Sequence, residues 1–280
     1  MRNDLSFLNF SDDEERRTVA HALDLAYRAI DSSVCSSAFL NVREQNLVKT
    51  ALESDGSFCF SFYGGYPDFE RGILLCFPEY MTYTHFMNSG FIPSDQDNLP
   101  IISDQASNFI TLLKVSCSSF TNLTHRDYMG AMLGLGIERS SIGDIVVNNE
   151  HESFVFVAAK MAQFIISELK TVGRTPVKVS ERPLSEAVKI KQNLRIFDSV
   201  STSLRLDCVV SSITGISRDK AKSMIISGLV EHNYFARSKP DTEISQSDII
   251  SVRGYGKFRI IATDSKTSKG KYRLKAAKYI

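Results

Sequence analysis

The sequence has 280 residues, of which 43% are hydrophobic and 23% are charged, and its formal net charge is +1. This is the composition of a globular protein with a buried core, and the length suggests two or three domains. No apolar run reaches the roughly 18 to 20 residues that a membrane helix needs, and the polar start at residues 1–4 differs from a secretory signal. We therefore expect a cytoplasmic protein.

The five cysteines are scattered along the chain, and none has the C-x-x-C spacing of a zinc site or a redox motif. An odd number without a regular spacing also argues against a disulfide framework. Four of them lie in apolar surroundings and are expected to behave as small core residues: Cys59, Cys76, Cys117 and Cys208. We expect no metal and no cofactor.

The first part of the chain predicts an N-terminal α/β domain over residues 1–98. Residues 13–31 and 43–53 have the apolar spacing of amphipathic helices. Residues 57–63 and 72–78 are rich in aromatic and branched side chains, which is typical of strands. The polar, proline-containing segment that follows them indicates a domain boundary.

Residues 99–182 predict a second domain with the order βαββαβ. That order is the split βαβ, or ferredoxin-like, pattern, which RRM domains share. The segment Val155-Phe156-Val157 has little of the aromatic RNA-reading motif of an RRM. Two roles for this sheet stay open: direct contact with RNA, and a structural or protein-docking role. The predicted elements are strands 109–115, 142–147, 154–158 and 175–179 and helices 124–135 and 159–171.

Polar residues at the ends of these elements suggest a second contact surface. His125, Arg126 and Arg139 are its candidate residues, and Asp144 lies nearby in the sequence. Functional residues are common at such positions. The alternative is that these side chains are solvated helix ends, with Asp127 favouring the helix dipole.

Residues 183–280 form the third predicted domain, which begins with two short helices. The first starts near Ser203, and the second runs from Ser217, which can cap its first turn, to Gly228, which can end it in a left-handed conformation. Arg218 and Lys222 are four residues apart and so share one edge of the second helix. One face of the helix pair therefore packs and the other presents cations.

The rest of this domain is predicted to be a small β element. Residues 229–230 lead to a turn near Asn233, and residues 248–252 alternate before Gly254 and Gly256. From Glu181 to Ile280 there are 19 Lys and Arg against 10 Asp and Glu, so an almost neutral chain carries a basic end. Such segregation is the electrostatic footprint of nucleic-acid binding, although a basic end can also serve solubility.

This third domain resembles the S4 RNA-binding domain. Tyr234 and Ser247 depart from its pattern, since the family usually has glycine there, and both bear on turn geometry. The motif residues present are Arg205, Leu206, Asp207, Ser217, Arg218, Ala221, Ile225, Gly228, Val230, Asn233, Lys239, Pro240, Asp248, Ile250, Val252, Arg253, Gly254, Gly256 and Lys257.

Motifs upstream extend the resemblance to nearly the whole chain. They are Phe62-Tyr63-Gly64-Gly65-Tyr66-Pro67, His125-Arg126-Asp127, Gly143-Asp144-Ile145 and Pro183-Leu184-Ser185-Glu186. With them the sequence resembles the YlmH family of bacterial S4-domain proteins. The resemblance implies an α+β protein with an N-terminal α/β region, a central RRM-like domain and a C-terminal S4 domain. It also implies a non-catalytic role on the large ribosomal subunit, with tRNA, when translation stalls.

The leading hypothesis is therefore a monomeric protein that binds structured rRNA and tRNA through its S4 domain. One alternative is an RNA-modifying enzyme, because Arg205-Leu206-Asp207 resembles a catalytic motif of pseudouridine synthases; another is a scaffold for cell-division proteins. The candidate RNA-binding residues are Arg205, Ser217, Arg218, Lys220, Lys222, Asn233, Lys239, Arg253, Lys257 and Arg259.

Overall fold

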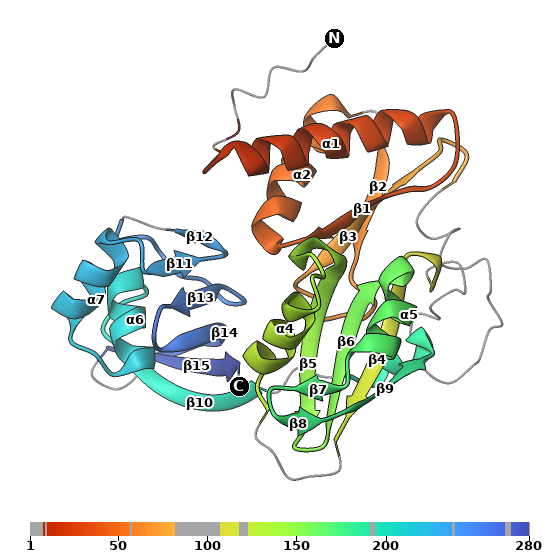
Figure 1. The fold of residues 1–280 in the computed structure, drawn as a ribbon. Helices are drawn as coiled ribbons and strands as arrows, with labels where there is room; N and C mark the ends of the chain where they lie inside the picture. The colour runs from red at the N-terminus through yellow and green to blue at the C-terminus, as the bar shows by residue number, and fades with distance from the viewer. Residues whose placement is uncertain are drawn as a thin grey trace, which may run out of the picture. The chain divides into compact units, whose positions relative to one another are not determined.

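The computed structural model divides into two compact units, Met1–Gln192 and Asn193–Ile280. It describes residues 8, 10–56, 58–81, 107–117, 123–190, 194–236, 239–266 and 270–279. Both units combine helices with antiparallel sheets (Figure 1), which confirms the predicted α+β class. The division into three domains stays a prediction.

The first unit opens with two helices and three strands. Local capping explains where the helices begin and end. Asp12 accepts a hydrogen bond from the Glu15 N–H at 2.9 Å, Asn41 and Glu44 form a capping box, and Gly56 ends the second helix at φ +72°. The elements are α1 Asp13–Ile30, β1 Cys35–Leu40, α2 Val42–Asp55, β2 Cys59–Tyr63 and β3 Gly72–Phe77.

These strands form an antiparallel sheet in the order β1-β3-β2, so every residue of the central strand β3 is buried. One face packs against α1 and α2 around Val19, Val48 and Leu74. The other face packs through Phe39 and Leu75 against the next part of the same unit. Strand β1 was not predicted, because its segment Cys35–Leu40 begins with polar residues.

The second half of this unit has the predicted βαββαβ order, with a short hairpin inserted before its last strand. The last strand lies three residues later than predicted, at 178–182 instead of 175–179. In the sheet the strands follow the order β5-β6-β4-β9. The elements are β4 Ile110–Ser116, α4 His125–Gly134, β5 Ile142–Asn149, β6 Glu152–Ala158, α5 Ala159–Glu168, the hairpin β7 Thr171–Val172 and β8 Thr175–Pro176, and β9 Lys178–Arg182.

Both faces of this four-stranded sheet are covered. Helices α4 and α5 pack on one face around Met132, Val155 and Ile165. The opposite face packs against the three-stranded sheet, where the fully buried Phe156 stacks on Tyr66 with ring centroids 4.7 Å apart. An RRM stacks bases on this second face. Here the N-terminal sheet occupies it.

The second unit is a six-stranded antiparallel sheet with two helices on one face (Figure 1). The predicted helix from Ser217 to Gly228 is confirmed, whereas the preceding helix begins at Leu206, three residues later than predicted. The sheet order is β10-β15-β14-β13-β11-β12. The elements are β10 Leu194–Ser201, α6 Leu206–Thr214, α7 Arg218–Ile226, β11 Val230–His232, β12 Phe235–Ala236, β13 Ile249–Val252, β14 Gly256–Lys266 and β15 Tyr272–Tyr279.

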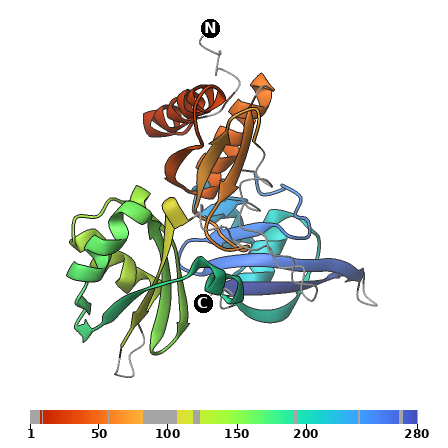
Figure 2. The same ribbon diagram turned by 90° about the vertical axis from the view of Figure 1, so that its right-hand side faces the viewer.

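The helices of this unit and the inward side chains of the sheet share one core. It includes Val209, Ile225, Ile250, Phe258 and Leu274. Because side chains alternate along a strand, the residues between these inward positions point to the opposite, helix-free face. Figure 2 shows the long antiparallel pair β14 and β15 that carries much of that face.

The described residues contain neither a candidate membrane-spanning helix nor a candidate metal site. No helix in the ranges given above is both long and apolar enough to cross a bilayer. Within the same ranges, no three His, Cys, Asp or Glu side chains are grouped so that they could hold a metal ion.

Candidate nucleic-acid interface

A buried carboxylate holds two arginines side by side where α6 and α7 begin. Asp207 has no exposed surface, while the side chains of Arg205 and Arg218 are 43% and 49% exposed. The Nε of Arg218 donates to Asp207 Oδ2 at 2.9 Å, and the Nε of Arg205 donates to Oδ1 at 3.3 Å. Each guanidinium thus binds Asp207 through its inner edge and leaves donors free to face solvent. We call Arg205, Asp207 and Arg218 the arginine clamp.

Electrostatics keep the clamp charged. Burial raises the pKa of the Asp207 carboxyl, but hydrogen bonds from Arg218, Arg205 and the Cys208 N–H outweigh burial, so its pKa lies below the usual value. The same carboxylate raises the pKa of Arg218. Two fixed guanidinium groups at one surface are suited to bind phosphate oxygens, because the fork of N–H donors matches that geometry.

Helix α7 adds two lysines beside the clamp. Ser217 caps the helix as predicted, since its hydroxyl accepts a hydrogen bond from the Lys220 N–H at 3.3 Å. Lys220 is exposed, and its ammonium lies 5.8 Å from the ring centre of Tyr255. Lys222 is half-buried and lies one helical turn after Arg218. The structure thus brings together the predicted RNA-binding residues of the two helices: Arg205, Ser217, Arg218, Lys220 and Lys222.

The loop that carries Lys239 joins this group. The Asp207 N–H donates to the Pro240 carbonyl at 3.0 Å, and the Leu206 N–H donates to the Thr242 carbonyl at 2.8 Å. These bonds tie the loop to the start of α6. Lys239 is exposed there, one residue from Pro240.

The predicted strand residues lie elsewhere. Lys257 and Arg259 alternate with the buried Phe258 and Ile260, so they point to the helix-free face of the sheet. Arg253 follows the last residue of β13. The candidate RNA-binding residues therefore fall into two groups, because the sheet separates the cations of the helices from those of the strands.

Aromatic residues flank the strand cations, and sequence reasoning did not identify them. The Lys257 ammonium lies 4.5 Å from the ring centre of Tyr234 and 4.8 Å from that of Tyr279, and it donates to the Tyr234 hydroxyl at 3.1 Å. The pairing of β14 with β15 and the contact of Lys257 with the β11–β12 turn bring these residues together. A cation between aromatic rings is a common feature of surfaces that bind single-stranded nucleic acid.

Asn233 has a structural task. Its side-chain oxygen accepts a hydrogen bond from the Ile249 N–H at 2.9 Å, and its side-chain amide donates to Asp248 at 2.8 Å. His232 also contacts the Asp248 carboxylate, at 2.7 Å. These bonds fix the turn between β11 and β12. A contact between Asn233 and RNA stays a prediction.

The two departures from the S4 pattern keep a glycine-like backbone. Asn233, Tyr234 and Ser247 have φ values of +51°, +67° and +72°, the positive values recorded for non-glycine residues in the described ranges. Asn233 and Tyr234 form the two-residue loop of a hairpin whose turn type requires positive φ at both positions. The turns are thus retained with strain that glycine would avoid.

Replacing Ser247 by Gly is expected to raise the free energy of unfolding by about 0.5 to 1 kcal/mol. The left-handed conformation costs an L-residue about 1 to 2 kcal/mol, and the greater flexibility of glycine in the unfolded chain offsets part of the gain. Urea unfolding checks this. Ser223→Gly, on the exposed side of α7, is the matched control and should instead lower stability by about 0.5 kcal/mol. Equal losses in both variants would contradict the strain argument.

The candidate second surface in the first unit is only partly exposed. His125 and Arg126 are exposed in the first turn of α4, but Asp144 is buried and accepts hydrogen bonds from the Tyr66 hydroxyl and the Arg71 N–H. Arg139 is half-buried; burial and the nearby Arg71 lower its pKa to about 10. The alternative that these polar side chains are solvated is wrong for Asp144, because Tyr66 and Arg71, from the segment between β2 and β3, donate hydrogen bonds to its buried carboxylate.

Comparison with known proteins finds similarity over most of the chain. A family model described as "Putative RNA-binding domain in YlmH" matches residues 104–186. The ribosome-associated protein quality control protein P2 of Bacillus subtilis (strain 168) is 30% identical over 236 residues, 84% of each chain. The solved structure of the cell division protein ylmH from Streptococcus pneumoniae has a TM-score of 0.48 and 22% identity, covering 65% of this chain and 98% of its own. The family match lies in the first unit, and the arginine clamp lies in the second.

Proposed function

The chain belongs to the YlmH family, and on this premise we propose that it is a non-catalytic protein that binds structured RNA of the ribosome. The observation that carries the proposal is the arginine clamp. A buried Asp207 that fixes Arg205 and Arg218 at the surface prepares two guanidinium groups for a phosphate backbone before any ligand arrives. Lys220 and Lys222 extend the charge along α7.

The proposed target is folded RNA on the large ribosomal subunit, together with tRNA, when translation has stalled. The relative from Bacillus subtilis, which is named for ribosome-associated quality control, supports this context. A-form RNA exposes its phosphates and 2′-hydroxyls more readily than its base edges, so a clamp of guanidinium groups would recognise backbone shape. Contacts by His125, Arg126 and Arg139 would form a second, smaller surface on the first unit.

The burial of Asp207 supports a positioning role over a catalytic one. The residue lies in the Arg-Leu-Asp segment that resembles the motif of pseudouridine synthases, where an aspartate must reach the substrate. Here the carboxylate has no exposed surface, and both of its oxygens accept hydrogen bonds from arginine. Nucleoside mass spectrometry of RNA incubated with the protein should therefore reveal no modified base.

Binding of the full chain to isolated large ribosomal subunits at several salt concentrations tests the proposal. We expect affinity to fall as salt rises, because phosphate contacts release counterions. Lys220→Gln should weaken binding about equally for RNAs of different sequence and reduce the salt slope by about one. Lys49→Gln, at an exposed lysine of α2, should leave the slope unchanged. Failure to bind, or an unchanged slope in Lys220→Gln, would reject the proposal.

A further inference from the structure

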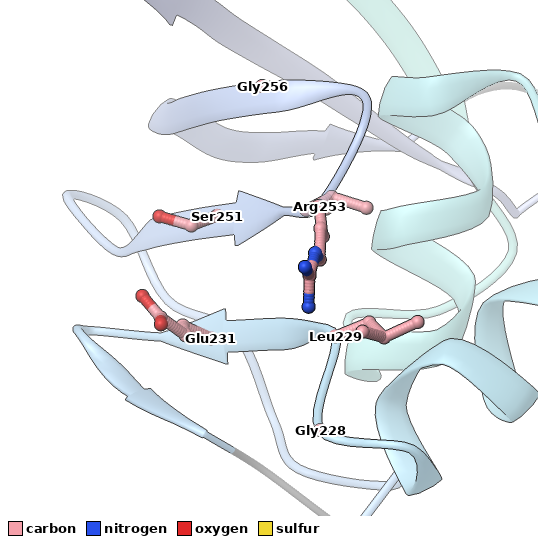
Figure 3. A pocket seen from close by; sticks show the side chains of 7 residues that line it. Gly228, Leu229, Glu231, Ser251, Arg253 and Gly256 are labelled. Atoms are coloured by element: carbon pink, nitrogen blue, oxygen red, sulfur yellow. The ribbon is translucent and has the colours of Figure 1, made fainter.

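A pocket of about 300 Å³ lies between the ends of β11 and β13 in the second unit (Figure 3). Gly228 and Gly256 contribute backbone to its wall without a side chain. The buried Val252 also lines the pocket, and its side chain belongs to the core. The volume is at the lower end of the range for small-molecule pockets, which favours a single ring system over a larger ligand.

Strand register places four side chains around this pocket. Glu231 pairs with Ser251, and the Arg253 N–H donates to the Leu229 carbonyl at 3.0 Å. Glu231 and Ser251 thus stand opposite each other within β11 and β13, and Leu229 and Arg253 stand opposite each other where β11 begins and β13 ends. The four residues mark the corners of a rectangle, with Arg253 and Glu231 on its diagonal.

The charged groups at the two ends of the pocket are a hydrogen-bond donor, the Arg253 guanidinium, and an acceptor, the Glu231 carboxylate. Figure 3 shows the Arg253 guanidinium reaching from β13 toward β11, while the Glu231 carboxylate lies at the other end of the pocket. In the described part of the chain, neither side chain has a hydrogen bond or an ion pair. A ligand between them would need acceptors on one edge and donors on another.

We propose that this pocket binds an unpaired guanine base. Guanine presents O6 and N7 as acceptors that match a guanidinium fork, and N1–H and N2–H₂ as donors that match a carboxylate. Adenine lacks this arrangement, because its N6 amino group is a donor where guanine has the O6 acceptor. The inference rests on the proposed RNA-binding function and adds recognition of one base to contacts with the backbone.

The test measures binding of the full chain to short single-stranded RNAs that differ at one position. Guanosine there should bind roughly tenfold more tightly than adenosine, the discrimination typical of one good bidentate pair. Inosine, which lacks the N2 amino group, and 7-deazaguanosine, which lacks N7, should each lose part of this preference. Equal affinity for guanosine and adenosine would overturn the proposal.

Two variants test which side chain binds which edge of the guanine base. Glu231→Gln should reduce the difference between guanosine and inosine, because only one acceptor oxygen remains. Arg253→Lys should reduce the difference between guanosine and 7-deazaguanosine, because an ammonium replaces the planar fork of donors. Asp198→Asn is the matched control: it makes the same charge change at an exposed residue of β10, in the same sheet. A guanosine-to-inosine ratio that Glu231→Gln leaves at the wild-type value would also overturn the proposal.

Binding of guanosine monophosphate tests the pocket independently of the proposed binding of structured RNA. If the pocket binds the base, the mononucleotide should shift the NMR amide signals of Glu231 and Ser251 more than adenosine monophosphate does. It should do so even in an Arg218→Glu/Lys222→Glu chain, whose binding to folded RNA is expected to be strongly weakened. A free nucleotide and an RNA base share the guanine ring. A lower dissociation constant for the oligonucleotide than for the mononucleotide would identify RNA as the ligand. The absence of any shift, with folded RNA still bound by the wild type, would reject the pocket and retain the proposed function.

Discussion

Reversing the charge of Arg218 and Lys222 together is expected to weaken binding to structured RNA by about 100-fold near 0.1 M salt. Each phosphate contact supplies roughly a factor of ten or less, and a carboxylate placed at the same position repels the backbone. Both side chains lie on one edge of α7, so the reversal converts a continuous part of the surface from attractive to repulsive. Gel shift and co-sedimentation with large ribosomal subunits measure the loss.

The salt dependence provides a second readout of the same variant. Removing two phosphate contacts should reduce the slope of log affinity against log salt by about two. Arg28→Glu/Lys49→Glu reverses two exposed cations of α1 and α2 and gives the chain the same net charge. If this control lost as much affinity, net charge and not the α7 surface would explain binding, and the proposed interface would be wrong. Circular dichroism of both variants verifies that they remain folded.

Local signals explain why the sequence predicted α7 and its cations. Ser217 and Gly228 are cap residues whose effect extends over one turn, so the helix between them depends little on distant contacts. The helical spacing then places Arg218 and Lys222 on one edge without further information. The fold class followed from the same kind of evidence, repeated over successive elements.

The strands at the end of the chain were missed because their pattern is hidden. In β15 the inward residues are Leu274 and Ala276, and the residues that alternate with them include Arg273 and Lys275. Small alanines and frequent cations look like a basic tail, and the alternation becomes meaningful only when β14 and β10 pair on either side. Consequently the aromatic pair around Lys257 could not be predicted either.

Burial of the two important aspartates also depends on contacts far along the chain. Asp144 is covered because Tyr66 and Arg71, more than 70 residues earlier, donate to it. Asp207 is buried under Arg218, which comes from the next helix. A sequence shows that acids and bases are present, but tertiary packing decides which of them meet.

Replacing Asp207 by Asn is expected to lower the free energy of unfolding of the second unit by about 2 kcal/mol at pH 7. The variant keeps the shape and can still accept from the Cys208 N–H, but its amide offers donors where Arg218 needs an acceptor. Hydrogen bonds between charged groups contribute about 1.5 to 3 kcal/mol, and the partial exposure of both arginines places the loss at the lower part of that range. Urea unfolding measures it, with Asp198→Asn as the control.

The same substitution should weaken RNA binding about tenfold, because free arginines must lose conformational entropy when they bind phosphate. The pH dependence of the free energy of unfolding tests whether the charge of Asp207 is responsible. Since the folded-state pKa of Asp207 is lowered, its stabilisation is complete above the unfolded pKa of about 3.9 and disappears as pH falls through the folded value. The stability difference between wild type and Asp207→Asn should thus shrink below about pH 4. A difference that stayed constant from neutral to acid pH would show that the carboxylate charge does not hold the clamp, and the preorganised surface on which the proposed function depends would lose its physical basis.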